Sequence, residues 1–150
     1  MGAYYEDFEV GKTHVTPGRT VTDYEVAAFA GLSGDFNSIH TDREFAATTS
    51  FGEPIAHGVL GLAIATGLIA RTGLFDGTAV AFLGIDGWKF SGPILFGDTI
   101  HVEFVITSKR ETKNPATGLI VRAIKIINQR GEVIQSGDTT LLVRRRGDSA

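Results

Sequence analysis

The longest apolar run of the chain lies between His57 and about Thr72, where valine, leucine, isoleucine, alanine and glycine follow one another. These residues are apolar almost all round a helical wheel, which is typical of a helix enclosed by the rest of the protein. Arg71 and Gly73 are residues that commonly end a helix. We therefore expect one long buried helix here. Its small residues, which would let a β-sheet approach closely, are Gly61, Ala63, Ala65 and Gly67.

The hydrophobic pattern changes period in the second half of the chain. Residues 101–107 alternate between apolar and polar, as a half-buried strand does. Residues 79–90, 119–127 and 132–143 are further strand-like runs, and the turn residues 128–131 predict a hairpin between the last two. Four consecutive strands with short connections favour an antiparallel sheet. The pattern predicts an α+β domain whose antiparallel sheet wraps around the long central helix.

The first part of the chain predicts smaller elements. The first twenty residues indicate a loop followed by a short edge strand, because Pro17 cannot donate a hydrogen bond to a neighbouring strand. Thr22 followed by Glu25 matches a capping box, the start signal of a helix. We expect this helix over about residues 23–31, with Gly31 as its C-terminal cap.

A loop is predicted next, because residues 33–41 are largely turn formers. Thr41 and Glu44 repeat the capping-box pattern, which predicts a short helix through residues 45–47. The loop is therefore held between two capped helices. Such a frame suits side chains that must be positioned accurately.

Composition and charge narrow the class of protein. The 150 residues, 43% hydrophobic and 21% charged, suit one soluble globular domain over residues 1–150. A net charge of -3 gives no reason to expect nucleic acid or an anionic membrane as a partner. The chain has no cysteine, which excludes a disulfide framework, a zinc–cysteine site and a thiol nucleophile. No signal peptide is recognisable and the longest apolar segment is too short to span a bilayer, so we expect a cytoplasmic protein.

The loop between the two predicted helices carries a carboxylate and an imidazole, those of Asp35 and His40. Their spacing does not place them on one face of a helix, but a loop can bring them together. His57 and Gly58 open the apolar helix, where backbone N–H groups have no helical partner and the helix dipole is positive. A glycine there lets a ligand atom approach closely. The alternative is structural: an Asx-turn at Asp35, an exposed His40 and a glycine required for packing.

Two other chemistries fit the residues less well. Asp35, His40 and His57 could form a two-histidine, one-carboxylate iron site, but no spacing signature supports it, and we expect no metal. Ser33 or Ser38 could combine with the Asp35–His40 pair as in a hydrolase triad. The chain has no Gly-x-Ser-x-Gly elbow to expose such a serine.

Residues 32–42 (LSGDFNSIHTD), 45–46 (FA) and 51–58 (FGEPIAHG) resemble the hydratase 2 motif of the MaoC-like (R)-specific enoyl-CoA hydratases. The resemblance is continuous over about residues 22–70, and the order of elements fits to the C-terminus. The motif is long and specific. Members of this family have the hot-dog fold, so the resemblance implies that fold here.

The resemblance also implies roles for particular residues. Asp35 and His40 occupy the positions of the catalytic acid–base pair. The backbone N–H of Gly58 occupies the oxyanion position, where it would bind the thioester oxygen, and His57 precedes it as a substrate-site residue.

Three further positions follow from the same comparison. Asn37 matches a motif residue that holds the loop. Thr66 falls where some relatives carry a serine in the site. Ser38 departs from the motif, because many relatives have proline there, and serine leaves the loop less rigid.

The resemblance implies reversible syn addition of water to a trans-2-enoyl-CoA thioester, giving an (R)-3-hydroxyacyl-CoA. No metal or redox cofactor is expected, since coenzyme A arrives as part of the substrate, and the fold implies a homodimer or higher homo-oligomer. One alternative is a dehydratase of acyl-carrier-protein thioesters. The others are a non-catalytic subunit that binds acyl-CoA and a thioesterase.

Overall fold

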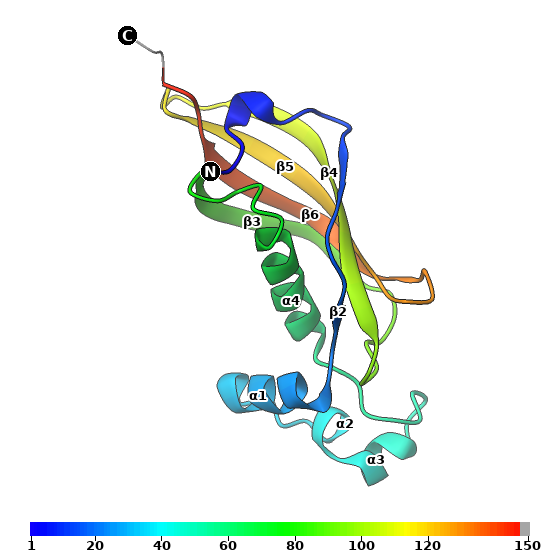
Figure 1. Ribbon diagram of the computed structural model, residues 1–150. Coiled ribbons are helices and arrows are strands. Elements are labelled where there is room, and N and C mark those ends of the chain that lie inside the picture. The colour runs from blue at the N-terminus through cyan, green and yellow to red at the C-terminus, as the bar shows by residue number, and fades with distance from the viewer. Residues whose placement is uncertain (148–150) are drawn as a thin grey trace.

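The computed structural model of the chain describes residues 1–147. An antiparallel sheet curves around helix α4 (Gly58–Ala70), and three shorter helices form the opposite end of the molecule (Figure 1). This arrangement confirms the predicted α+β architecture of a sheet wrapped around a long helix. Among the described residues, no helix is long and apolar enough to cross a membrane.

The sheet has six strands. They are β1 (Thr13–Val15), β2 (Arg19–Thr20), β3 (Ala79–Phe90), β4 (Thr99–Glu111), β5 (Thr117–Ile127) and β6 (Val133–Arg144), and a short 3-10 helix, η1 (Tyr5–Asp7), precedes them. Their order is β1-β4-β5-β6-β3, with β2 also paired to β4, and all pairs are antiparallel. The expected edge strand near the N-terminus is confirmed as β1. Strand β3 follows α4 directly but lies at the far edge, where it pairs with β6.

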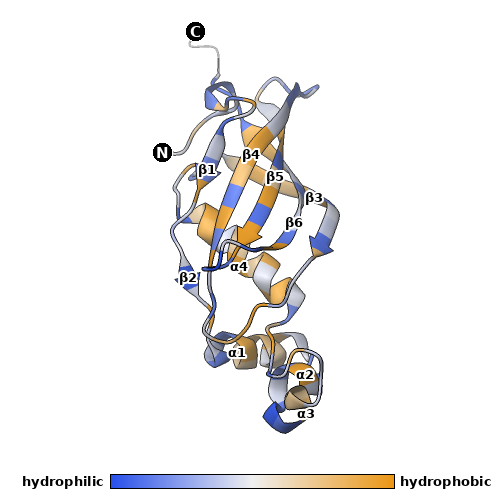
Figure 2. Ribbon diagram, turned by 90° about the vertical axis from the view of Figure 1, so that its right-hand side faces the viewer, coloured by the Kyte–Doolittle hydropathy of each residue, from blue (hydrophilic) through white to orange (hydrophobic). Residues whose placement is uncertain are grey.

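The core lies between the sheet and α4. Alternate residues of β4, namely Ile100, Val102, Phe104 and Ile106, are fully buried, as the alternation predicted. Leu60, Ile64 and Leu68 of α4 are buried as well. Figure 2 shows hydrophobic residues along α4 and along the strands β4 and β5.

Helix α1 spans Asp23–Ser33 and begins as predicted, because the Glu25 carboxylate accepts a hydrogen bond from the Thr22 backbone N–H at 2.9 Å. The predicted end at Gly31 is wrong. The helix continues to Gly34, which has a φ of 78° and whose N–H donates to the carbonyl of Ala30. A left-handed residue is the usual way to close a helix, and glycine adopts it without strain.

The predicted loop and second capping box are both wrong in part, as the next two helices show. One helical turn, α2 (Ser38–Thr41), lies within the segment that we expected to be a loop. Helix α3 (Arg43–Ala47) is capped by Asp42, whose side chain accepts from the Phe45 N–H at 3.0 Å. Thr41 cannot serve as the cap because it is the last residue of α2.

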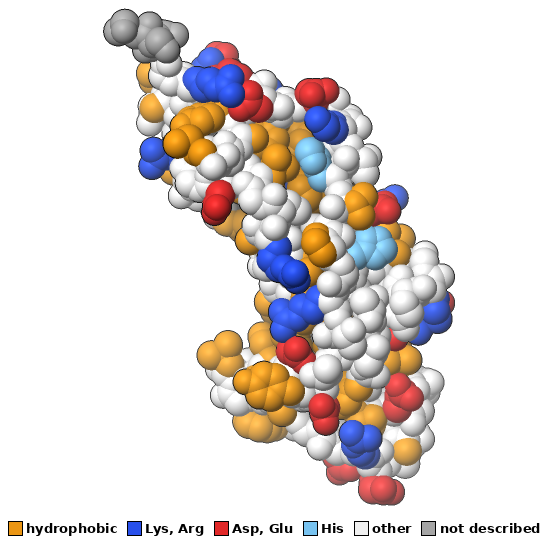
Figure 3. All heavy atoms as spheres, viewed as in Figure 1, with side chains coloured by type: hydrophobic (Ala, Val, Ile, Leu, Met, Phe, Trp, Pro, Cys, Tyr) orange, Lys and Arg blue, Asp and Glu red, His pale blue; other side chains and the backbone are white. Residues whose placement is uncertain are grey.

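Helix α4 is not enclosed on all sides within one chain. One face is exposed to solvent, and it consists of Val59, Ala63, Thr66, Gly67 and Ala70. Hydrophobic side chains are also exposed over α1 (Figure 3), where Tyr24 is 76% and Leu32 is 84% exposed. The expectation of a fully buried helix is therefore wrong for the single chain.

The first prediction concerns Glu25 at the start of α1. Hydrogen bonds from the Thr22 side chain, and then from the Thr22 backbone and Arg19, lower the pKa of Glu25 to about 2, although burial opposes the shift. Because the pKa of this group is about 4.5 without these contacts, its stabilising effect is complete above about pH 5 and is lost as the pH falls through about 2. We expect Glu25→Gln to lose less free energy of unfolding than the wild type between pH 5 and pH 3, measured by urea denaturation. Equal losses in the two proteins would contradict this account.

Candidate active site

The segment between α1 and α2 is held by a series of short-range hydrogen bonds. The Ser33 hydroxyl donates to the Phe29 carbonyl at 2.7 Å and accepts from the Asp35 N–H at 3.2 Å. The Asp35 carboxylate accepts from the Asn37 N–H at 3.2 Å, as in an Asx-turn. The Asn37 side chain accepts from the Ile39 N–H at 3.2 Å and so caps α2. The backbone on both sides of Asp35 is thus fixed locally.

His57 connects this segment to the start of α4. Its side chain is buried, with 3% of the residue exposed, and its Nε2 lies 2.9 Å from the backbone oxygen of Asp35. Because a carbonyl oxygen only accepts, Nε2 carries the hydrogen and donates it. The ring stacks on His40, with centroids 3.8 Å apart, and Phe29 contacts it edge-on. His57 therefore holds the segment at Asp35 in place. It does not line the cleft beside His40.

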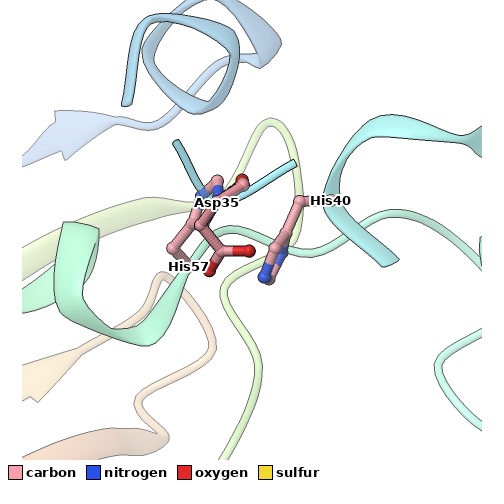
Figure 4. Close-up of side chains that lie close together, drawn as sticks. All are labelled: Asp35, His40 and His57. Atoms are coloured by element: carbon pink, nitrogen blue, oxygen red, sulfur yellow. Dashed lines mark hydrogen bonds between the residues drawn. The ribbon is translucent and has the colours of Figure 1, made fainter. Parts of the chain in front are cut away.

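His40 is held in one tautomer. Its Nδ1 lies 2.7 Å from the backbone oxygen of Ile55, so Nδ1 carries the hydrogen and donates it. The neutral ring keeps its lone pair on Nε2, which can accept a proton. The Asp35 carboxylate points toward this ring (Figure 4). One side-chain oxygen of Asp35 and one ring nitrogen each of His40 and His57 lie within 4.8 Å of one another.

A cleft of about 520 Å³ adjoins His40. Gly58 and Val59 at the start of α4 form one side of it, Phe90 at the end of β3 another, and Gln135 of β6 also lines it. Most of the lining is apolar. The cleft therefore has the character of a site for a small organic group beside a few polar atoms.

The connection from β3 to β4 forms another wall of the cleft, and Asp98 holds it. This buried carboxylate accepts hydrogen bonds from the Leu95 N–H at 3.0 Å, from Gln129 at 2.7 Å and from Arg130 at 3.0 Å. Burial alone would raise the pKa of Asp98, but the hydrogen bonds from Arg130 and Gln129 outweigh it and lower this pKa. The wall is thus tied to the hairpin between β5 and β6.

The first turn of α4 has no side-chain cap, and Gly58 faces the cleft. Uncapped N–H groups at the positive end of a helix attract negative charge. A side chain at position 58 would also collide with Phe90, since a Cβ there would lie 2.7 Å from the ring atom Cε1. The glycine therefore fits both the expected oxyanion position and the packing alternative.

Thr66 is not brought to the cleft within this chain. It lies eight residues beyond Gly58, about 12 Å along the helix, and belongs to the exposed face of α4. Its hydroxyl donates to the Ala63 carbonyl at 2.7 Å. Its role in the site stays a prediction.

The cluster of Asp35, His40 and His57 has donor atoms close enough for a metal ion, but its geometry does not suit one. The two rings are nearly parallel, with an interplanar angle of 28° and centroids 3.8 Å apart. Ligand lone pairs lie in the ring planes, and such planes do not meet within the ~2 Å of a metal–nitrogen bond. One nitrogen of each ring is also engaged by a backbone carbonyl. The arrangement suits proton transfer better than coordination.

Phe90 and Gln135, which both line the cleft, were not predicted as site residues from the sequence. Phe90 ends a strand whose apolar residues gave no reason to single it out. Gln135 did carry a signal, because in the strand pattern it shares one face with the apolar residues Leu141 and Val143.

Solved structures of other proteins place the fold in a known class. A Mycobacterium tuberculosis protein with a double hot-dog fold is 22% identical and superimposes with a TM-score of 0.83, over 99% of this chain and 46% of that one. A protein from Archaeoglobus described as a monoamine oxidase regulatory protein is 33% identical with a TM-score of 0.90, over 97% of each chain. The fold is therefore a hot-dog fold, as the resemblance implied.

The family follows from the sequence comparisons. The MaoC like domain matches residues 7–124. The (R)-specific enoyl-CoA hydratase of Aeromonas caviae is 38% identical over 117 residues, which are 78% of this chain and 82% of that protein. The chain belongs to the MaoC-like domain family.

The second prediction tests the support that His57 gives to the segment at Asp35. His57→Phe keeps a ring against His40 but removes the donor to the Asp35 carbonyl. We expect it to lower the free energy of unfolding by about 1–2 kcal/mol, measured by urea denaturation. The control is His14→Phe, because His14 stacks on Phe104 and its buried Nε2 has no hydrogen-bond partner among the described residues. If both variants lost the same stability, the hydrogen bond would not be the cause.

Proposed function

We propose that this protein is an (R)-specific enoyl-CoA hydratase, a hydro-lyase that adds water reversibly to a trans-2-enoyl-CoA thioester. The observation that carries the proposal is the close approach of the Asp35 carboxylate to the ring of His40, whose Nδ1 is bonded to Ile55, beside the cleft where α4 begins. The similarity to the Aeromonas caviae hydratase supports it. The same catalyst works in both directions, so it is also a 3-hydroxyacyl-CoA dehydratase.

The acid–base step follows from the geometry of the pair. Polar atoms within 4.8 Å of each other can be bridged by one water molecule that hydrogen-bonds to both. As the water oxygen bonds to C3 of the enoyl group, its proton passes to the Asp35–His40 pair. The π electrons of the double bond move to C2 and the thioester oxygen, and the pair returns a proton to C2. Acid–base assistance of this kind accelerates a reaction by about 10²–10⁴.

The start of α4 acts on the thioester group of the substrate. Negative charge develops on the thioester oxygen while C3 is attacked. The N–H of Gly58 donates to that oxygen, and the helix dipole adds to the stabilisation. A donor placed in this way typically accounts for a factor of about 10²–10³ in rate.

The proposed reaction moves a proton and a hydroxyl group without a change of oxidation state in any cofactor. It requires only groups of the protein and the coenzyme A that the substrate carries. The hydrogen bonds of the two histidines suit this chemistry, because they leave Nε2 of His40 to exchange a proton while the His57 ring holds the backbone of Asp35.

The third prediction tests the roles of Asp35 and His40. We expect Asp35→Asn and His40→Ala to hydrate crotonyl-CoA at least about 100-fold more slowly than the wild type, because each removes one partner of the acid–base pair. The loss of the enoyl-thioester absorbance measures the rate.

The matched control is Asp42→Asn, in the same segment. Asn caps a helix about as well as Asp, so this variant keeps the cap of α3 and should keep the wild-type rate. A wild-type rate in Asp35→Asn or His40→Ala would refute the assignment. Hydration of a carrier-protein thioester but not of crotonyl-CoA would replace the substrate proposed here.

We also propose that the enzyme is a homodimer, with β3 at the interface. Strand β3 forms one edge of the sheet and pairs only with β6 among the described residues. Its exposed hydrophobic side chains are Val80, Phe82, Leu83, Ile85 and Phe90, each between 43% and 56% exposed. An edge of this length with apolar side chains is a template for another strand. A second copy of this chain, antiparallel to the first, would cover it.

The open face of α4 supports the same proposal. A helix that is apolar all round is stable only when it is covered, and one face of α4 is exposed in a single chain. A groove of about 370 Å³ between α1 and α4 continues the apolar surface. Large apolar surfaces of this kind mark protein interfaces.

The fourth prediction tests this interface. The wild type is expected to sediment as a dimer, at twice the 16.0 kDa of one chain. Leu83→Glu should sediment as a monomer at micromolar concentration, because it places a charge on the apolar edge. Ser108→Glu, at an exposed position of β4, is the control and should remain a dimer. A dimeric Leu83→Glu variant would exclude β3 from the interface.

A further inference from the structure

Gln135 of β6 is almost completely buried, with 1% of its surface exposed, and it lines the cleft beside the start of α4. A buried amide destabilises a protein unless its polar atoms find partners. Both ends of this one have a partner. Its Nε2 donates to the backbone oxygen of Gly58 at 3.0 Å, and Trp88 Nε1 donates to its Oε1 at 3.1 Å.

The two partners also fix which way round the amide lies. An indole N–H can only donate and a backbone oxygen can only accept. Turning the amide over would set donor against donor at Trp88 and acceptor against acceptor at Gly58. The series Trp88–Gln135–Gly58 therefore has one arrangement, and it connects the strands β3 and β6 to the first residue of α4.

Close packing between Gly61 and Gln135 also holds α4 against β6. A Cβ on Gly61, one turn along α4, would collide with the Gln135 amide and would lie 2.7 Å from Cδ1 of Ile94. The glycine thus lets the helix lie directly against the amide. Helix α4 has no side-chain cap of its own, and among the described residues Gln135 is the side chain that hydrogen-bonds to the backbone of its first turn.

We propose that Gln135 is a positioning residue that sets where the Gly58 N–H lies relative to Asp35 and His40. The inference rests on the proposed function, in which that N–H binds the thioester oxygen. The tethered carbonyl and the N–H belong to the same residue and are joined by the helical backbone of α4, so the tether restrains the position of the donor. A displacement of 1 Å in a reacting constellation can reduce the rate by about 10²-fold.

The effect should fall on kcat and not on KM. The thioester oxygen carries more negative charge in the transition state than in the bound substrate, so a misplaced donor weakens transition-state binding most. A residue needed only for folding would instead lower the amount of active protein and leave the kcat of the folded fraction unchanged.

The first test uses Gln135→Met, which keeps the length of the side chain and removes both hydrogen-bonding groups. With crotonyl-CoA we expect kcat per folded protein to fall by about 10- to 100-fold and KM to change by less than about threefold. Thr139→Val is the matched control, because Thr139 is a fully buried polar residue of the same strand and bonds to Arg122. It should reduce thermal stability while keeping kcat.

The second test uses Gln135→Glu and keeps the inference falsifiable if the methionine variant does not fold. A protonated carboxyl can donate to the Gly58 oxygen as the amide does, whereas an ionised carboxylate repels it. The ratio of variant to wild-type kcat should therefore fall as the pH rises through the pKa of the new carboxyl. A ratio independent of pH would overturn the inference.

The wild type is measured beside each variant, so the two proposals can fail separately. No hydration by the wild type would remove the proposed function. Hydration by the wild type with an unchanged kcat in folded Gln135→Met would leave that function in place and overturn only the role of Gln135.

Discussion

The hydrogen bond from the His57 ring to the Asp35 backbone carbonyl joins two segments that are 22 residues apart in the chain. One segment carries the carboxylate of the proposed acid–base pair, and the other opens the helix whose N-terminus faces the cleft. His57 is also stacked against His40. Its buried ring therefore sets the spacing between the Asp35 segment, His40 and the start of α4. The exposed loop at Asp35 is therefore held by a rigid, buried side chain. A catalytic group on a loop needs such a contact to keep its position.

The sheet determines the rest of the geometry. Strands β3 and β6 meet the first turn of α4, where Phe90 packs on Gly58 and Gln135 bonds to it. Glycines at positions 58 and 61 let the helix come close enough for these contacts. The cleft thus lies where a helix N-terminus, a sheet edge and a fixed histidine converge, and each contributes one part of the proposed chemistry.

Much of this could be predicted from the sequence, because local physical signals were strong. The Thr22–Glu25 capping box, the alternation along β4 and the apolar run of α4 each specify an element directly. The motif resemblance gave the pair Asp35 and His40, and the hydrogen bond that keeps Nε2 of His40 free agrees with the role proposed for it.

The remaining features depend on contacts between distant residues, which local patterns do not contain. Gly31 and Gly34 are equally good helix-ending residues in sequence, and only the fold selects Gly34. The position of β3 beside β6, rather than beside β4, follows from how the sheet closes around α4. The partnership of Gln135 with Trp88 and Gly58 spans 47 and 77 residues.

The most direct test of the central claim is hydration of crotonyl-CoA in deuterium oxide, with the product analysed by NMR and by its chirality. Because one acid–base pair serves both carbons from the same side, we expect 3-hydroxybutyryl-CoA with a single deuterium at C2, on the same face as the new hydroxyl group. Its configuration at C3 should be (R), as the similarity to the Aeromonas caviae hydratase implies. Deuterium on the opposite face would contradict a single Asp35–His40 pair as the catalyst, and an (S) product would contradict the proposed (R) specificity.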